Sequence, residues 1–212
     1  MKRAIVALTV SMLAVAPAAA VAQLAGMPNW NNPKGGTGIR IDAEYGGPNT
    51  DAGGGSAYGA RGTLGLGSLS FGLGFDSWTP TGSSAATSWG ATGAFRILGG
   101  SLMPVSLNLQ AGYGNSSDLK LKTYTLAAGL GVNLSIPGIT LNPWVSAGER
   151  WHDLSLSTVS NTTSNFGWVI GADVGLGIFG IHAAYDSESK QGGGTAGVLG
   201  IGAHVTLNTP GL

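Results

Sequence analysis

The sequence predicts an all-β fold, a transmembrane up-and-down barrel of antiparallel strands, from three observations. Apolar residues alternate with small or polar ones along most of the chain, which is the pattern of a strand with two different faces. Short turns and long polar loops alternate between the predicted strands. Aromatic residues gather at the long-loop ends of those strands, as they do at a membrane interface.

Alternation predicts ten strands, with an eight-stranded barrel as the alternative because the ninth strand is short. The predicted ranges are 37–46, 57–66, 69–78, 87–98, 103–113, 122–136, 139–152, 165–178, 181–187 and 195–208. Two-residue turns are predicted at Gly67-Ser68, Pro137-Gly138 and Phe179-Gly180, and each would pair two apolar residues on one face. Long polar loops follow the odd-numbered strands, including one from 153 to 165. This arrangement is typical of outer-membrane barrels, whose short turns face the periplasm.

The residues before the barrel have the organisation of a secretory signal peptide. Lys2 and Arg3 precede an apolar run, and the small residues Ala20 and Ala22 mark a cleavage site before Gln23. The chain is accordingly divided into a cleaved leader, a periplasmic segment, the barrel and a C-terminal tail: 1–22, 23–36, 37–208 and 209–212.

Composition excludes several classes of protein. Only 9% of the 212 residues are charged, against about 25% in an ordinary soluble domain. Ten basic residues balance ten acidic ones, which argues against a nucleic-acid partner. The absence of Cys excludes disulfides, thiol nucleophiles and thiolate metal sites. No spacing indicates a phosphate loop or a metal site, so no cofactor and no metal are expected.

The apolar face of the strands is expected to contact lipid. It is continuous over the ten strands, whereas the other face is small and polar and carries almost no Lys, unlike the outer surface of a soluble barrel. Trp78 also ends the third strand at the long-loop end. The predicted girdle at the outer interface consists of Tyr45, Tyr58, Phe75, Trp89, Tyr113, Tyr124, Trp151, Trp168 and Tyr185.

Leader, hairpin rhythm and girdle together resemble those of small Gram-negative outer-membrane β-barrels of the OmpA and OmpX type. The resemblance rests on pattern, and the chain end at Leu212 lacks the terminal aromatic residue that such barrels commonly carry. It implies a protein of the cell outer membrane that contacts outer-membrane lipids and, during insertion, the barrel-assembly machinery. We expect a structural or surface-interaction role; the alternative is a narrow porin that passes small hydrophilic solutes.

Nine charged residues on the strands have inward parity, whereas Glu149 has lipid-facing parity close to the outer rim. The nine inward side chains should pair, because an isolated charge away from water is costly. They form either a structural network of salt bridges or a charged constriction that selects solutes. The predicted lumen network is Arg40, Asp42, Glu44, Arg61, Asp76, Arg96, Arg150, Asp173 and Asp186.

The predicted Phe179-Gly180 turn places Asp173 directly opposite Asp186. Like charges directly opposite each other destabilise a sheet. The repulsion between the two carboxylates is therefore expected to be relieved by an Arg such as Arg40 or Arg61, by a shared proton or by a bound cation.

Three histidines, His152, His182 and His204, also have inward parity. His152 lies near Ser155, as a hydrolase would require. However, His152-Asp-Leu-Ser155 does not match the His-x-Ser-Asn motif of the outer-membrane lipid A deacylases, and we expect no enzyme activity.

Overall fold

In the computed structural model the described residues are 23–29, 32, 35–100, 103–156 and 159–207. The predicted leader 1–22 and tail 209–212 lie outside them. The strands are β1 (Gly36–Pro48), β2 (Ser56–Gly67), β3 (Leu69–Thr79), β4 (Ala86–Gly100), β5 (Met103–Ser116), β6 (Leu121–Val132), β7 (Leu134–Ile136), β8 (Ile139–Leu156), β9 (Val159–Leu176), β10 (Phe179–Ser189) and β11 (Thr195–Leu207). A short 3-10 helix, η1 (Thr50–Ala52), follows β1.

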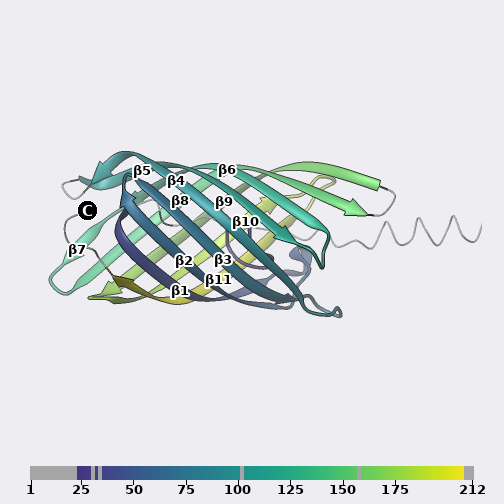
Figure 1. Cartoon of the computed structure of the whole chain (residues 1–212), viewed down its shortest axis with the longest axis horizontal. Coiled ribbons are helices and arrows are strands. Elements are labelled where there is room, and N and C mark those ends of the chain that lie inside the picture. The colour runs from purple at the N-terminus through teal and green to yellow at the C-terminus, as the bar shows by residue number, and fades with distance from the viewer. Residues whose placement is uncertain (1–22, 30–31, 33–34, 101–102, 157–158, 208–212) are drawn as a thin grey trace, which may run out of the picture.

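The strands close into an antiparallel barrel in which each pairs with its sequence neighbours (Figure 1). β1 pairs with β11, and the β6–β8 pairing closes the sheet on the other side. β6 and β7 are two parts of one strand, interrupted at Asn133, whose backbone N–H donates to the carbonyl oxygen of Pro104 at 2.6 Å. The barrel therefore has ten strands, as predicted. We call its two ends the long-loop end and the short-turn end.

Two of the three predicted hairpin turns are confirmed. Leu66 pairs with Leu69, and Ile136 pairs with Ile139. The third prediction is wrong, because β9 ends at Leu176 and β10 begins at Phe179, so the turn is Gly177-Ile178. The favoured two-residue hairpin turns, types I′ and II′, have a positive φ at their first turn position. Gly177 adopts a φ of +65° there, a conformation that a bulky Phe disfavours.

The corrected turn changes the register of β9 against β10. Asp173 pairs with His182, and Asp186 pairs with Val169, so the two carboxylates are not opposite each other. Both side chains remain buried inside the barrel, at 4% and 3% exposure. The inward parity of Asp173 and Asp186 is therefore correct although their pairing is not.

The predicted loop from 153 to 165 is also wrong, because β8 and β9 continue through most of it as a hairpin that projects at the long-loop end (Figure 1). Asp153 pairs with Thr162, and the Thr162 hydroxyl donates to the Asp153 carboxylate at 2.6 Å. The segment is rich in Thr and Ser, and β-branched Thr favours strands even without an apolar face.

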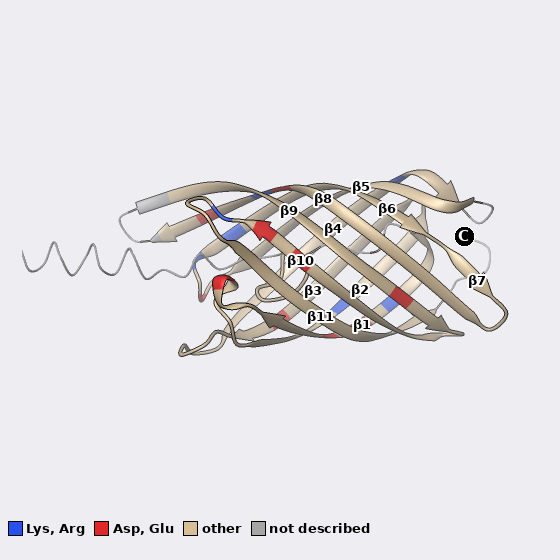
Figure 2. Ribbon diagram, turned by 180° about the vertical axis from the view of Figure 1, so that it is seen from behind, with Lys and Arg blue, Asp and Glu red and all other residues tan. Residues whose placement is uncertain are grey.

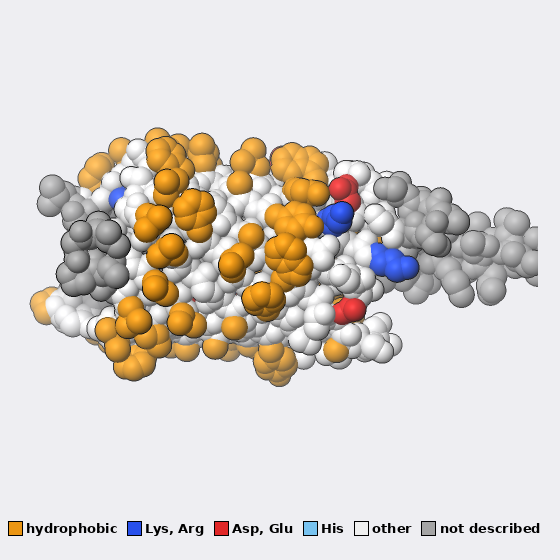
Figure 3. All heavy atoms as spheres, viewed as in Figure 1, with side chains coloured by type: hydrophobic (Ala, Val, Ile, Leu, Met, Phe, Trp, Pro, Cys, Tyr) orange, Lys and Arg blue, Asp and Glu red, His pale blue; other side chains and the backbone are white. Residues whose placement is uncertain are grey.

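The outer surface of the barrel is apolar. Leu, Ile and Phe side chains point outward along every strand pair, with Leu73 at 61% and Ile181 at 63% exposure. Figure 3 shows apolar side chains in bands across the visible face of the barrel, with most charged side chains of that view lying beyond the band at the long-loop end. Among the described residues, no helix has the length and apolar character needed to cross a membrane.

The nine predicted girdle residues lie around the outside near the long-loop end. Their rings contact one another across strands: Tyr45 with Tyr58 at 5.2 Å between ring centroids, and Tyr113 with Tyr124 at 5.3 Å. Further ring contacts join Trp89 to Tyr113 and Trp168 to Tyr185, while Phe75 pairs in register with Trp89, and Tyr124 with Trp151. Trp78 is different: it is 1% exposed and lies inside the barrel.

Candidate functional site in the barrel lumen

Residues 23–29 lie inside the barrel. For this part of the chain the structure differs from the periplasmic segment predicted over 23–36. Gln23 Nε2 donates to the Thr125 hydroxyl of β6 at 2.9 Å, and the N–H of Ala25 donates to the Ser88 hydroxyl of β4 at 3.0 Å. On the opposite wall, the N–H of Asn29 donates to the Asp186 carboxylate of β10 at 2.8 Å. The segment therefore crosses the lumen from one wall to the other.

Inward-facing glycines make room for this segment. A Cβ atom at any of seven positions would meet an atom of residues 23–28: Gly46, Gly59, Gly74, Gly90, Gly112, Gly114 and Gly200. We call these residues the glycine seat. They come from β1, β2, β3, β4, β5 and β11, so the small residues on the polar face of the strands accommodate a specific part of the chain.

The segment makes an apolar contact with residues near the long-loop ends of β3 and β6. Leu24, Ala25 and Met27 pack in one buried cluster with Trp78 and Leu121. The indole Nε1–H of Trp78 donates to the carbonyl oxygen of Gly54 at 3.0 Å. Trp78 was missed as a lumen residue because aromatic type suggested the girdle, although its parity matches that of the inward Asp76.

A cavity of about 630 Å³ lies on the other side of the segment. Gln23 and Asn29 of the segment line one end of the cavity, and Thr37 and Gly177 line the end near the short turns. Much of its wall is polar or charged. The cavity therefore extends from residues 23–29 towards the short-turn end.

Most of the predicted lumen charges gather into two clusters. Charged residues are sparse along the strands (Figure 2). The histidine cluster comprises Arg40, Asp42, Glu44, Arg61, Asp173, His182 and His204. The Arg150 cluster comprises Thr123, Arg150, His152, Asn165, Asp186 and Glu188.

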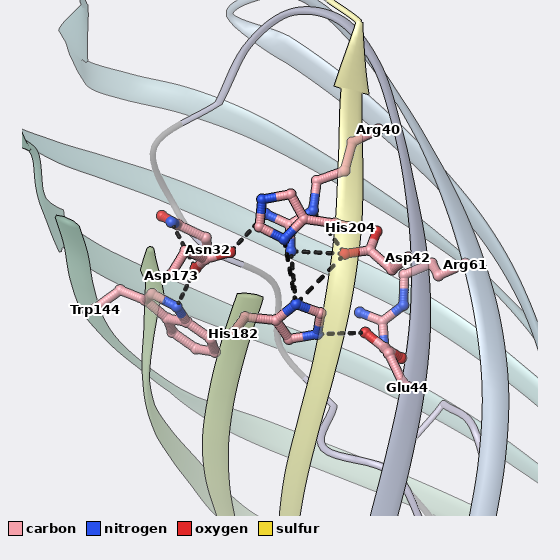
Figure 4. Close-up of polar contacts among 9 residues, drawn as sticks. All are labelled: Asn32, Arg40, Asp42, Glu44, Arg61, Trp144, Asp173, His182 and His204. Atoms are coloured by element: carbon pink, nitrogen blue, oxygen red, sulfur yellow. Dashed lines mark hydrogen bonds and ion pairs between the residues drawn. The ribbon is translucent and has the colours of Figure 1, made fainter. Parts of the chain in front are cut away.

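Arg40 is central to the histidine cluster (Figure 4). Its guanidinium contacts the Asp42 carboxylate at 2.6 Å through Nη2 and the Asp173 carboxylate at 2.6 Å through Nη1. Asp173 also accepts from the Asn32 side chain at 2.9 Å and from the Trp144 indole at 3.1 Å. The expectation that Arg40 neutralises Asp173 is confirmed.

Glu44 and the two histidines form the other part of this cluster. Glu44 forms an ion pair with Arg61 at 3.0 Å, whereas the sequence suggested Asp173 as the partner of Arg61. The Nε2 atom of His182 lies 3.3 Å from the same Glu44 carboxylate. The Nδ1 atoms of His182 and His204 lie 3.4 Å apart.

The Arg150 cluster is almost completely buried near the long-loop end. Arg150 contacts Asp186 at 2.8 Å and Glu188 at 3.0 Å, and all three side chains are at most 3% exposed. A Cβ atom at Gly167 would meet the Arg150 guanidinium, so this glycine provides its space. Glu188 was missed because the predicted ninth strand ended one residue earlier. The cation that pairs with Asp186 is therefore Arg150.

Thr123, His152 and Glu188 form a hydrogen-bonded row. The Thr123 hydroxyl lies 3.1 Å from Nδ1 of His152, whose Nε2 lies 2.7 Å from Glu188. A nucleophile, base and acid are arranged in this order in hydrolases. However, Thr123 is 1% exposed, and none of the three residues lines the lumen cavity. The row is therefore buried apart from the lumen cavity in the described structure.

Two predicted lumen residues lie outside both clusters. Asp76 is buried and accepts from the Ser88 hydroxyl, which also receives the N–H of Ala25. Through Ser88, Asp76 thus helps to hold residues 23–29 in place. Arg96 lies near the short-turn end, close to Gly35.

No protein-family model matches the chain, and no curated protein matches its sequence. Its fold is similar to the β domain of the Bordetella autotransporter BrkA, at 13% identity over 82% of this chain and 100% of that one, with a TM-score of 0.49. The N-terminal barrel of Pseudomonas aeruginosa OprF matches at 15% identity over 82% and 99%, with a TM-score of 0.39. The outer membrane enzyme PagL matches at 12% identity over 79% and 99%, with a TM-score of 0.45.

A similarity at 12–15% identity concerns the fold alone. The closed strand order, the apolar exterior and the ring of aromatic side chains are features of this chain's own structure. The described chain is an antiparallel up-and-down β-barrel whose apolar exterior is that of a membrane-spanning barrel.

Proposed function

We propose that this protein has a structural or surface-interaction role in the outer membrane and that its own residues 23–29 keep its lumen closed. The observation that carries the proposal is the fit of the segment to the barrel. Ala25 and Met27 are 0% exposed, and the segment is bonded to β4, β6 and β10. A segment held at several points on opposite walls obstructs the passage of solutes.

The projecting β8–β9 hairpin supports the surface-interaction part of the proposal. It extends at the long-loop end, and its polar residues Ser155, Thr162 and Ser164 are exposed. A paired hairpin is a stiffer platform than a loop, because its backbone groups bond to each other. Contact with outer-membrane lipids, delivery by a cleaved leader and insertion by the barrel-assembly machinery remain part of this proposal.

The second candidate is a narrow porin, and the charged cavity favours it. A space of about 630 Å³ lined by Arg40, Asp42 and Asp173 could select small hydrophilic solutes. Conduction would require residues 23–29 to leave the glycine seat. The two candidates therefore differ in whether the segment stays in place.

Planar-bilayer conductance of the purified, refolded protein tests the proposal. A chain that begins at Gln23 should show no stepwise openings at neutral pH, whereas the same chain lacking residues 23–29 should show them. Folding of both chains is checked by heat-modifiable gel migration. Openings in the chain that retains the segment would overturn the structural role and favour the porin.

A further inference from the structure

We propose that Asp42, His182 and His204 form a binding site for a divalent transition-metal ion such as Zn²⁺ on the inner wall of the barrel. Their potential ligand atoms all lie within 4.8 Å of one another. The three residues come from adjacent strands β1, β10 and β11. Asp42 pairs with His204, and His182 pairs with Gly202 two residues away.

The spacing of the two imidazoles fits a metal ion. Zinc–nitrogen bonds are about 2.0–2.1 Å long, so two nitrogen ligands of a tetrahedral site lie about 3.3–3.4 Å apart. The Nδ1 atoms of His182 and His204 are separated by 3.4 Å. A carboxylate oxygen of Asp42 lies 3.8 Å from Nδ1 of His182. Two imidazole nitrogens and one carboxylate oxygen form the ligand set of an open zinc site.

The proton arrangement on His182 leaves the correct atom free for a metal. A guanidinium can only donate hydrogen bonds, so the Arg40 contact at 3.3 Å places a lone pair on Nδ1 of His182. The ring proton is then on Nε2, 3.3 Å from the Glu44 carboxylate, which Arg61 holds at 3.0 Å. A carboxylate on the distal nitrogen is the partner that orients metal-bound histidines.

Arg40 occupies the position that a metal would take. Its Nη2 atom lies between the Asp42 carboxylate, at 2.6 Å, and Nδ1 of His182, at 3.3 Å. Metal entry therefore exchanges one cation for another, and the Arg40 guanidinium retains Asp173 through Nη1. In Figure 4 the two histidine rings, Arg40 and Asp42 point toward this common centre.

The site is accessible from the lumen. Asp42, His182 and His204 all line the 630 Å³ cavity, so water or a solute can supply the remaining ligand. Imidazole ligands favour Zn²⁺, Cu²⁺ or Ni²⁺ over Mg²⁺ and Ca²⁺, which prefer oxygen ligands alone. The chemistry thus selects the class of metal.

Calorimetric titration of the tag-free, refolded full barrel with Zn²⁺ tests the site, and Co²⁺ absorption reports the ligand geometry. We expect one Zn²⁺ per barrel, with binding lost in His182→Gln and in His204→Gln. Glu44→Gln keeps the three ligands and should weaken binding about 10–100-fold. Arg40→Gln removes the competing cation and should tighten it. His152→Gln, in the Arg150 cluster, is the matched control and should bind as the unchanged chain does.

Absence of Zn²⁺ binding by the unchanged barrel would overturn the proposal, even if Arg40→Gln bound the ion. Equal affinity in the unchanged chain, His182→Gln and His204→Gln would also overturn it by locating the metal elsewhere. Circular dichroism and heat-modifiable migration confirm that each variant is folded. If a histidine variant fails to refold, the folded Arg40→Gln barrel, which retains all three ligands, provides the test. Tighter Zn²⁺ binding than in the unchanged chain supports the site, and unchanged affinity contradicts it.

Discussion

At the scale of single residues, parity along a strand decides whether a side chain meets lipid or the lumen, and size decides what fits inside. Trp78 and Phe75 are both aromatic residues near the end of β3, yet Phe75 is 66% exposed and Trp78 is 1% exposed. The difference follows from the two-residue period of the strand. Residue type alone therefore misassigns Trp78, whereas parity assigns it correctly.

Arg150 provides a test of the buried charges at this scale. Arg150→Gln leaves Asp186 and Glu188 inside the barrel without their cation, and removal of one partner from a buried ion pair costs about 3–5 kcal/mol. Urea unfolding in lipid vesicles measures the loss. The control is Lys190→Gln, whose partner Asp51 is 54% exposed, with an expected cost of about 0–1 kcal/mol. Similar losses for the two variants would contradict the buried network.

At the scale of strands and turns, alternation predicts most of the barrel, because each strand has one lipid-facing side. The strand number, the order of connections and two of the three tight turns followed from it. The β9–β10 turn could not be placed this way, because Leu176 and Ile178 continue the alternation of one strand while Phe179 already begins that of the next. Backbone conformation selects the Gly177-Ile178 turn, through the positive φ of Gly177.

The turn can be tested by two matched glycine substitutions. Neither Gly177 nor Gly62 has an atom within 4 Å of an added Cβ, but only Gly177 has a positive φ. Gly177→Ala should therefore destabilise the barrel by about 1–2 kcal/mol, the cost of left-handed backbone for an L-residue. Gly62→Ala should be neutral or slightly stabilising. Urea titration of both variants makes the comparison, and a neutral Gly177→Ala would contradict the observed turn.

The β8–β9 hairpin provides a test of orientation. Cys at Asn161, on the exposed part of the hairpin, should react with a membrane-impermeant thiol reagent on intact cells. Cys at Gly138, in the Pro137-Gly138 turn at the opposite end, should react only after the outer membrane is permeabilised. The chain has no Cys of its own, so the background is clean. Reaction with the opposite preference would invert the barrel in the membrane.

At the scale of the whole molecule, the sequence predicts the wall of the barrel but not what fills it. Residues 23–29 show no alternation, and their bonds join positions far apart in the chain, such as Asn29 and Asp186, 157 residues away. The grouping of Asp42, His182 and His204 arises in the same way, because β1 meets β11 only when the barrel closes. Parity placed these side chains inward, whereas only closure and register bring them together.

The glycine seat makes the closed lumen testable in the intact chain. A Cβ at Gly114 would meet the backbone of Gln23, so Gly114→Leu should displace the segment. Gly93→Leu is the control, because an added Cβ at Gly93 meets nothing within 4 Å, and its register partner Phe71 faces outward, away from the segment. A Cys introduced at Ala25, which is 0% exposed, reports the position of the segment. In refolded barrels, a thiol reagent should modify this Cys rapidly in the Gly114→Leu background and slowly in the Gly93→Leu and unchanged backgrounds. Equal rates in all three would mean that the seat does not hold the segment, because filling Gly114 displaces residues 23–28 only if they rest against it.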